Sequence, residues 1–296
     1  MHFFEFTDTM KEGSMNTLNE FDLLIYNTAV EAAMKAGELI KTQYHEFIAV
    51  ETEFAHDLKL DIDRKAEKAI IDIIESHYSD HSIITEEDGI KVKSGEYCWI
   101  IDPLDGSVNY YYGLPYFCTC IACYKISPAS VSRLAEGKKM GNPGEPVAGV
   151  VFSPVSSELY TAFKGKGAFR NGVRLSADTK RKLSEVIVIM STGSTPDIIN
   201  KSLCIANKFA LCARKVRMFG ATGLDIVNVA SGTAGVFIQK GTNLWDFAAS
   251  RVILEEAGGE IKYIETDAGK WDVVASNPAI SGEVDEILKS CGFYED

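Results

Sequence analysis

Apolar residues at positions 18–44 and again at positions 64–77 recur every three or four residues, which is the period of an amphipathic helix. The first run predicts a helix over Leu18–Tyr44, with these apolar positions: Leu23, Ala29, Ala33, Ala36 and Ile40. A second run predicts a helix over Arg64–His77, capped by Asp61 or Asp63. Its predicted buried face consists of Ala66, Ala69, Ile70, Ile73 and Ile74.

Strands and helices interleave through the rest of the chain. Short apolar runs predict strands over residues 82–85, 99–101, 117–126, 147–153, 158–163, 186–191, 215–219, 235–239, 261–263 and 272–276. Helical periods predict helices over residues 196–209, 221–231, 244–257 and 283–290, and Gly232 and Gly258-Gly259 are typical helix stops.

Two glycine-rich segments fall between the predicted strands. The segment 127–146 is polar and rich in Gly, Pro and Lys, which predicts a flexible excursion. The segment 164–172 carries lysines among its glycines but lacks the Gly-Lys-Ser/Thr ending of a P-loop, and its Asn171-Gly172 pair favours a hairpin turn.

The order of these elements predicts one α+β domain. Residues 18–184 form an α+β half and residues 185–296 a more regularly alternating α/β half, while residues 1–17 are expected to be a flexible tail. The chain has 296 residues, of which 46% are hydrophobic and 24% charged, enough for a large core or two joined lobes.

Charge and hydropathy exclude several classes of partner. The net charge of −12 argues against nucleic acid as the main partner, and no apolar run reaches the length of a membrane span. The first residues also lack the pattern of a signal peptide, and the seven cysteines are an odd number. We therefore expect a cytoplasmic protein with reduced thiols and no membrane partner.

Three cysteines, Cys118, Cys120 and Cys123, lie close together and could indicate a thiolate metal site. No second cysteine pair completes a zinc set, and the surrounding run 117–126 reads as a buried strand. We interpret these cysteines as small buried thiols of that strand.

The richest chemistry lies in the stretch from Trp99 to Asn109. Its apolar start predicts a strand that ends at Asp102, because Pro103 cannot donate a hydrogen bond to a neighbouring strand. Gly106 and Ser107 then suit a tight turn into a helix. Such a turn places the two carboxylates beside free backbone N–H groups. Carboxylates attract hard cations and N–H groups attract phosphate, but a turn with two solvated aspartates fits the same pattern.

Further acids have similar surroundings, and together they resemble a known family. Glu86-Glu87 follows a short strand, and Asp246 follows Trp245 in the first turn of an apolar helix. With the central Asp102-Pro103-Leu104-Asp105-Gly106-Ser107-x-Asn109, they resemble the inositol monophosphatase family, within the wider group of metal-dependent, lithium-sensitive phosphatases. The glycine-rich segment 165–172 and Glu256-Ala257-Gly258-Gly259 support the match from about Leu18 onward.

This resemblance implies a Mg²⁺-dependent phosphomonoesterase with a layered αβαβα sandwich, working as a homodimer on a small phosphorylated polyol or sugar. The implied ligands of two or three Mg²⁺ ions are Glu86, Asp102, the Leu104 carbonyl, Asp105 and Asp246. Ser107, where the family usually has threonine, and Glu86 would activate water, with Asp63 holding the hydroxyl. The implied substrate contacts are Asp105, Gly106, Ser107, Thr222 and Gln239.

Two departures from the family pattern leave the substrate open. Gln239 stands in place of a glutamate that contacts inositol hydroxyls, and Asn243 in place of a histidine. A fructose-1,6-bisphosphatase or a 3′-phosphoadenosine 5′-phosphate phosphatase is the alternative, with Arg217 and Lys240 as the nearest cations for a second phosphate. A metal-binding regulatory protein without turnover is the alternative from another class.

Overall fold

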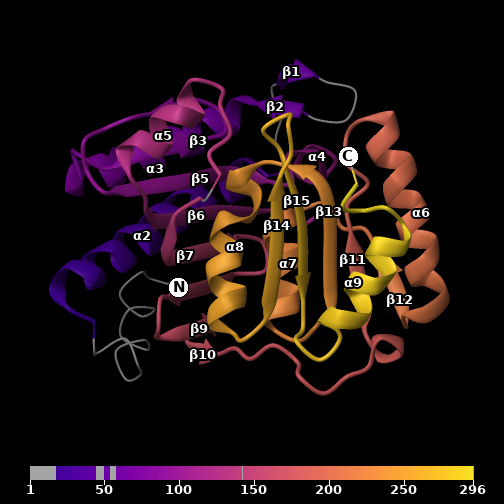
Figure 1. The fold of residues 1–296 in the computed structure, drawn as a ribbon. Coiled ribbons are helices and arrows are strands. Elements are labelled where there is room, and N and C mark those ends of the chain that lie inside the picture. The colour runs from indigo at the N-terminus through magenta and orange to yellow at the C-terminus, as the bar shows by residue number, and fades with distance from the viewer. Residues whose placement is uncertain (1–17, 45–49, 54–57, 142, 296) are drawn as a thin grey trace.

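Two large β-sheets, seen in Figure 1, form the frame of the protein. The computed structural model describes residues 18–44, 50–53, 58–141 and 143–295, so the predicted tail 1–17 lies outside the described residues. An eight-stranded sheet has the order β10-β9-β8-β7-β6-β5-β3-β4, and a five-stranded sheet has the order β12-β11-β13-β15-β14. Strands β1 (Val50–Glu53) and β2 (Leu58–Leu60) pair separately.

The strands of the larger sheet are β3 (Ser82–Thr85), β4 (Ile90–Lys91), β5 (Tyr97–Asp105), β6 (Cys118–Lys125), β7 (Glu145–Ser153), β8 (Glu158–Phe163), β9 (Gly167–Arg170) and β10 (Val173–Arg174). Those of the smaller sheet are β11 (Ile187–Met190), β12 (Lys215–Arg217), β13 (Val236–Thr242), β14 (Glu260–Glu265) and β15 (Trp271–Ser276). The predicted strands are all present: β3 and β8 match their predicted ranges, β6, β11 and β12 are shorter, and the others are longer or shifted, β5 most of all.

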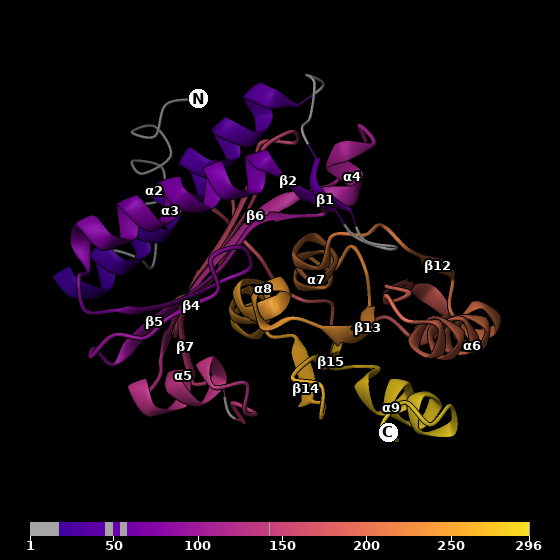
Figure 2. The same cartoon turned by 90° about the horizontal axis from the view of Figure 1, so that it is seen from above.

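Helices cover both sheets and separate them, as Figure 2 shows. Helices α2 (Glu20–Gln43) and α3 (Asp61–His77) pack on the outer face of the eight-stranded sheet. Helices α7 (Thr222–Ala230) and α8 (Leu244–Glu256) lie between the sheets, and α6 (Pro196–Cys212) and α9 (Ser281–Ser290) cover the outer face of the five-stranded sheet. This arrangement confirms the predicted α+β class and αβαβα layers. In the part of the chain described, no helix is long and apolar enough to cross a membrane.

The strand β5 does not stop at Pro103 as predicted. It continues to Asp105, but its pairing with β3 ends at Ile101 and its register with β6 is interrupted between Asp102 and Asp105. The missing N–H of Pro103 therefore falls where the ladder is already irregular, and its carbonyl accepts a hydrogen bond from the Thr119 hydroxyl at 2.8 Å. The chain remains extended across the proline.

The boundaries of α3 also differ from the prediction. The helix begins at Asp61 with Leu60 as N-cap, and Asp63 in its first turn accepts a hydrogen bond from the Leu60 N–H at 2.8 Å. Its buried face includes Ile62 and Ile71, whereas Ala69 and Ile73 are only half-buried. The apolar face is therefore rotated relative to the predicted one, because α2 packs along it and selects the side that is buried. In α2, Leu23 is exposed rather than part of the core.

The predicted flexible excursion 127–146 contains a short helix, α5 (Pro128–Ala135). The Ser127 hydroxyl caps it by accepting a hydrogen bond from the Ser130 N–H at 3.2 Å, and Pro128 occupies the first helical position. Serine at the N-cap followed by proline is a helix-start signal. The glycine-rich composition of the whole segment obscured it.

The predicted Asn-Gly hairpin is confirmed, and the turn that precedes it, between β8 and β9, contacts α8. Asn171 and Gly172 both have positive φ, 49° and 79°, as a type I′ turn between antiparallel strands requires. The Glu256 carboxylate at the end of α8 accepts hydrogen bonds from the Gly165 and Gly167 N–H groups at 2.8 and 2.7 Å. Two motifs about 90 residues apart thus join the larger sheet to the middle helix layer.

The buried His81 contacts three aromatic residues at the edge of the larger sheet, and these contacts predict how the stability of the fold depends on pH. Its ring is stacked between Tyr78 and Tyr97, and its Nδ1 accepts a hydrogen bond from Trp99 Nε1 at 3.1 Å. An accepting Nδ1 requires the neutral ring, and burial lowers the pKa of His81 from 6.5. Since the unfolded chain binds this proton more readily, the contribution of His81 to the stability of the fold is present above about pH 6.5 and is lost as pH falls below it.

We expect the variant His81→Gln to show a smaller decline of the urea unfolding midpoint between about pH 7.5 and 5.5 than wild type. Parallel profiles for the two proteins would contradict this.

Candidate active site

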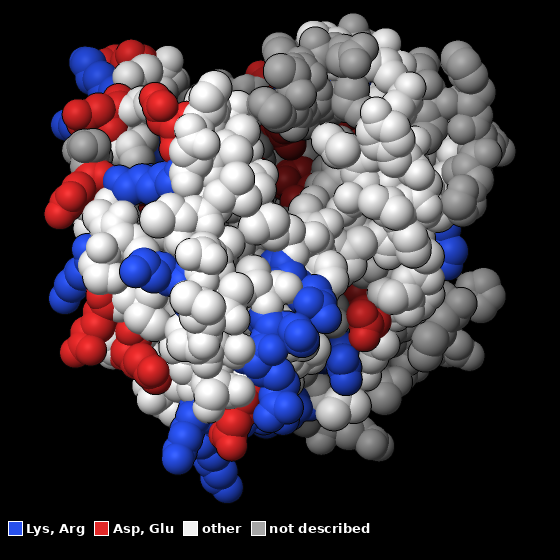
Figure 3. All heavy atoms as spheres, turned by 90° about the vertical axis from the view of Figure 1, so that its right-hand side faces the viewer, with Lys and Arg blue, Asp and Glu red and all other residues white. Residues whose placement is uncertain are grey.

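A cleft of about 410 Å³ opens where β5 ends and where α4 (Ser107–Tyr111), α7 and α8 begin. On the face drawn in Figure 3, acidic side chains are recessed in a hollow, while Lys and Arg gather on the surface below it. The structure brings to this one cleft every predicted site residue except Asp63: Glu86, Asp102, Leu104, Asp105, Gly106, Ser107, Thr222, Gln239 and Asp246.

Asp102 and Asp105 stand at the end of β5, where the irregular register turns the chain into α4. Asp102 accepts a hydrogen bond from the Leu104 N–H at 3.1 Å. The two oxygens of Asp105 accept from the N–H groups of Thr222 and Gly223, at 3.1 and 2.6 Å, in the first turn of α7. Asp105 therefore compensates the positive end of the α7 dipole and joins the two halves of the chain.

Asp246 also lines the cleft and lies in the first turn of α8. Its carboxylate accepts hydrogen bonds from the Thr242 hydroxyl at 2.5 Å and the Asn243 N–H at 2.9 Å. The strand β13 ends at Thr242, so the strand end and helix start together fix this side chain. Asp246 therefore belongs both to the first turn of α8 and to the lining of the cleft.

Glu86 is presented to the cleft by a loop that the buried Glu67 of α3 supports. The Glu67 carboxylate accepts hydrogen bonds from the Thr85 hydroxyl and from the N–H groups of Glu87 and Asp88, at 2.7 to 3.1 Å. The Glu87 side chain turns away from the cleft and pairs with Lys59 at 3.0 Å. Glu67 thus positions the loop, a role that its place in an amphipathic helix does not reveal.

The acids of the cleft fit a hard divalent cation. Burial raises the pKa of Asp102 well above its usual range, and the charges of Glu86, Asp105 and Asp246 raise it further. Burial and the charge of Asp246 likewise raise the pKa of Asp105. Carboxylate and carbonyl oxygens are the donors that Mg²⁺ prefers, and a cation would relieve this repulsion.

Gly106 and Ser107 form the turn into α4 that the sequence predicts. Gly106 has φ 90°, and a Cβ there would lie 3.0 Å from the Tyr116 carbonyl oxygen, so both backbone conformation and space favour glycine.

Asp63 is buried outside the cleft lining, at the start of α3. It belongs to the same region as Ser107, because β2, which leads into α3, packs against α4.

The wall formed by α7 and β13 carries polar side chains. The Thr222 hydroxyl donates a hydrogen bond to Gln239 Oε1 at 2.7 Å, so the two predicted substrate contacts are paired with each other. Asp225, which the sequence analysis missed, is buried beside them and accepts from the Tyr116 hydroxyl at 2.7 Å. Burial raises the pKa of Asp225 to about 7. Its position in an apolar helix gave no signal of a cleft residue.

The predicted cations for a second phosphate do not line the cleft. Lys240 is held by Asp272 and by the Phe293 carbonyl oxygen, and Arg217 donates to the Val216 carbonyl oxygen. Among the described residues of the cleft lining, Lys270 is the one with a positive charge. Its Nζ donates to Asn243 Oδ1 at 2.5 Å. The turn between β14 and β15 delivers this lysine, and no motif marks it.

Comparison with known proteins identifies the family to which the chain belongs. The model of the inositol monophosphatase family matches residues 24–290. The chain belongs to the inositol monophosphatase family. It is 36% identical to the Nus factor SuhB of Haemophilus influenzae over 90% of this chain and 96% of that protein. It is 32% identical to an inositol monophosphatase of Mesembryanthemum crystallinum over 88% of this chain and 94% of that protein.

A solved structure supports the same family at the level of the fold. The extragenic suppressor protein SuhB of Bartonella henselae superposes with a TM-score of 0.79 at 28% identity, covering 90% of this chain and 98% of that one. Membership of the inositol monophosphatase family places the chain in a superfamily of phosphatases and makes a small phosphorylated compound the expected class of substrate.

Proposed function

We propose that the protein is a Mg²⁺-dependent phosphomonoesterase that hydrolyses a small phosphorylated polyol or sugar. The convergence of Glu86, Asp102, the Leu104 carbonyl, Asp105 and Asp246 in one cleft carries this proposal, in a chain of the inositol monophosphatase family. These residues would hold two or three Mg²⁺ ions, because together they offer only oxygen donors. When bound, Mg²⁺ supplies positive charge that polarises the phosphoryl group and lowers the pKa of water.

In this proposal, other residues of the cleft region activate water, bind the phosphate and bind the rest of the substrate. Glu86 and the Ser107 hydroxyl orient a water molecule and accept its proton, and Asp63 holds that hydroxyl in place. The N–H groups of Gly106 and Ser107 receive the phosphate at the start of α4. Thr222 and Gln239 bind hydroxyl groups of the substrate, and because Gln239 is neutral these hydrogen bonds lack the charge assistance of a glutamate.

The direct test is phosphate release with and without Mg²⁺ from four compounds: inositol 1-phosphate, fructose 1,6-bisphosphate, 3′-phosphoadenosine 5′-phosphate and histidinol phosphate. Each is also assayed with lithium. One dominant, Mg²⁺-dependent and lithium-sensitive substrate is the expected result. No release from any compound, with Mg²⁺ binding intact by calorimetry, would favour a regulatory protein that binds metal without turnover. Some relatives carry the name Nus factor, which makes this control necessary.

Lys270 favours a second candidate, a phosphatase whose substrate carries another anionic group. All other charged side chains among the described residues of the cleft lining are acidic, namely Glu86, Asp102, Asp105, Asp225 and Asp246. Lys270 reaches the cleft rim beside Asn243, at the start of α8. A phosphate or carboxylate remote from the reacting phosphate would form a charge-assisted hydrogen bond with Lys270.

For a bisphosphate substrate we expect Lys270→Met to lower kcat/KM by roughly 10- to 100-fold, mostly through KM, because a hydrogen bond to a charged group contributes about 1.5–3 kcal/mol. Hydrolysis of inositol 1-phosphate should change little. Lys262→Met is the matched control, since Lys262 pairs with Asp285 outside the cleft. Equal losses on both kinds of substrate would argue against an anion contact.

A further inference from the structure

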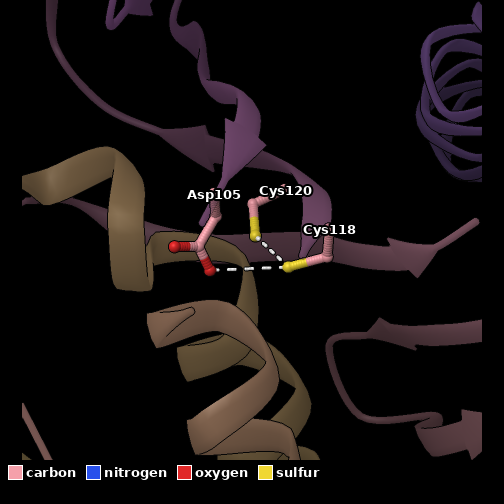
Figure 4. A group of neighbouring side chains, drawn as sticks. All are labelled: Asp105, Cys118 and Cys120. Carbon is pink, nitrogen blue, oxygen red and sulfur yellow. Dashed lines mark hydrogen bonds between the residues drawn. The ribbon is translucent and has the colours of Figure 1, made fainter. Parts of the chain in front are cut away.

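Two cysteines of β6 meet a carboxylate of β5 beneath the proposed magnesium site. Figure 4 shows Cys118 and Cys120 turned toward Asp105. The distance from Cys118 Sγ to Asp105 Oδ2 is 3.4 Å, and the two sulfur atoms are 3.7 Å apart. One ligand atom from each of the three residues lies within 4.8 Å of the others. Two thiols and a carboxylate are a mixed donor set, unlike the all-oxygen set of the cleft.

The first two of these spacings match the edges of a zinc tetrahedron. Bonds of about 2.3 Å to sulfur and about 2.0 Å to oxygen place tetrahedral ligands about 3.8 Å apart for two sulfurs and about 3.5 Å apart for sulfur and oxygen. We propose that Asp105, Cys118 and Cys120 form a site for a thiophilic divalent cation such as Zn²⁺ or Cd²⁺. Three ligands from the protein leave a fourth position for water.

The fold brings these donors together. Cys118 and Cys120 are two residues apart in β6, so both side chains point to the same face of the sheet, toward α7, while Cys123 belongs to the core on the other face. The backbone of Gly223 in α7 closes the group. A Cβ at Gly223 would lie 2.4 Å from Cys120 Sγ and 3.2 Å from both Cys118 Sγ and Asp105 Oδ2. The three donor atoms therefore converge on the one position of α7 that has no side chain.

Asp105 provides the route by which a cation reaches the buried thiols. Its carboxylate lines the cleft on one side and contacts Cys118 on the other. As two metal–sulfur bonds form, the two thiol protons leave to solvent. Neutral thiols are poor ligands for Mg²⁺, whereas Zn²⁺ and Cd²⁺ displace such protons readily, so the site selects soft cations over the hard cation of the cleft.

Asp105 belongs both to the proposed Mg²⁺ site and to the thiol site, and this sharing has a functional consequence that rests on the proposed function. A carboxylate held by a soft cation is no longer available as a Mg²⁺ ligand. Zn²⁺ is therefore an inhibitor that competes with Mg²⁺, and its binding requires the cysteines of β6. The binding itself does not depend on turnover, so it can be tested even if no phosphatase substrate is found.

The experiment titrates the full-length reduced protein with Cd²⁺ and follows the ultraviolet thiolate-to-cadmium charge-transfer absorption. Wild type is compared with Cys118→Ala, Cys120→Ala and Cys123→Ala. Cys123 is the matched control because it is buried in the same strand on the opposite face. All four proteins keep Cys204, Cys212 and Cys291, which lie at or near the surface, so background binding is equal.

We expect Cys118→Ala and Cys120→Ala each to weaken Cd²⁺ binding on the order of tenfold or more, with Cys123→Ala unchanged. Circular dichroism verifies that each variant is folded. Absorption that is equal in all four proteins would overturn the site. If the absorption follows the expectation but Zn²⁺ inhibits wild type and Cys118→Ala equally, the competition with Mg²⁺ is wrong while the proposed phosphatase activity stands.

Discussion

Replacing Asp246 by asparagine should lower Mg²⁺-dependent phosphate release by about a thousandfold or more. The amide keeps the shape of the side chain, and its oxygen can still accept from Thr242 and the Asn243 N–H, so α8 should start as before. What it loses is the negative charge that would hold a cation between the two halves of the chain. A loss of several kcal/mol of transition-state stabilisation corresponds to this factor.

Asp102→Asn is the companion variant, and it separates catalysis from stability. Because burial and three neighbouring acids raise the pKa of Asp102, the metal-free protein should become more stable when this charge is removed. We expect a higher thermal midpoint without Mg²⁺, a smaller gain on adding Mg²⁺, and turnover reduced as in Asp246→Asn.

The control for both variants is Asp61→Asn. Asp61 lies in the first turn of α3, pairs with Lys65 and does not line the cleft. Its turnover and its response to Mg²⁺ should be those of wild type. Near-normal turnover in Asp246→Asn or Asp102→Asn, measured at saturating Mg²⁺, would contradict the assignment of these carboxylates as metal ligands.

Replacing Gly149 by alanine should destabilise the fold by about 1–3 kcal/mol, because it forces the middle helix layer away from the larger sheet. Gly149 lies in β7, directly under α8. A Cβ there would be 2.4 Å from the Ala249 carbonyl oxygen and 2.9 Å from Val252 Cβ. The first contact is with helix backbone, so the strain cannot be relieved by a rotamer change. Moving α8 also moves Asp246.

Urea unfolding measures the first effect as a lower midpoint with an unchanged slope, and kcat/KM measures the second. Gly282→Ala is the matched control. Gly282 lies in the first turn of α9, and a Cβ there meets no heavy atom within 4 Å, so this variant should be neutral or stabilising by up to about 1 kcal/mol. Equal stability of Gly149→Ala and wild type would show that β7 and α8 can separate without cost.

Local signals explain how far the sequence predicted the fold. Helices such as α7 and α8 were predicted within one residue, because their apolar period and glycine stops act within a few turns. The Asn171-Gly172 turn was predicted for the same reason, since its backbone conformation depends on the two residues themselves. The extension of β5 through Pro103 was not, because it depends on a register break against β6.

The sequence by itself determined most of the helices and strands, through periodicity, and the acidic residues of the cleft, through the motif that resembles the inositol monophosphatase family. Only the tertiary structure decided which charged and metal-binding side chains lie together in and beneath the cleft. It brought Lys270 rather than Arg217 or Lys240 to the cleft, and it set Cys118 and Cys120 against Asp105. Both outcomes depend on contacts between strands and turns far apart in the chain, and electrostatic and metal-binding energies fall steeply with distance. The spacing of these residues along the chain therefore could not predict either arrangement. The packing of the two sheets around α7 and α8 produces both.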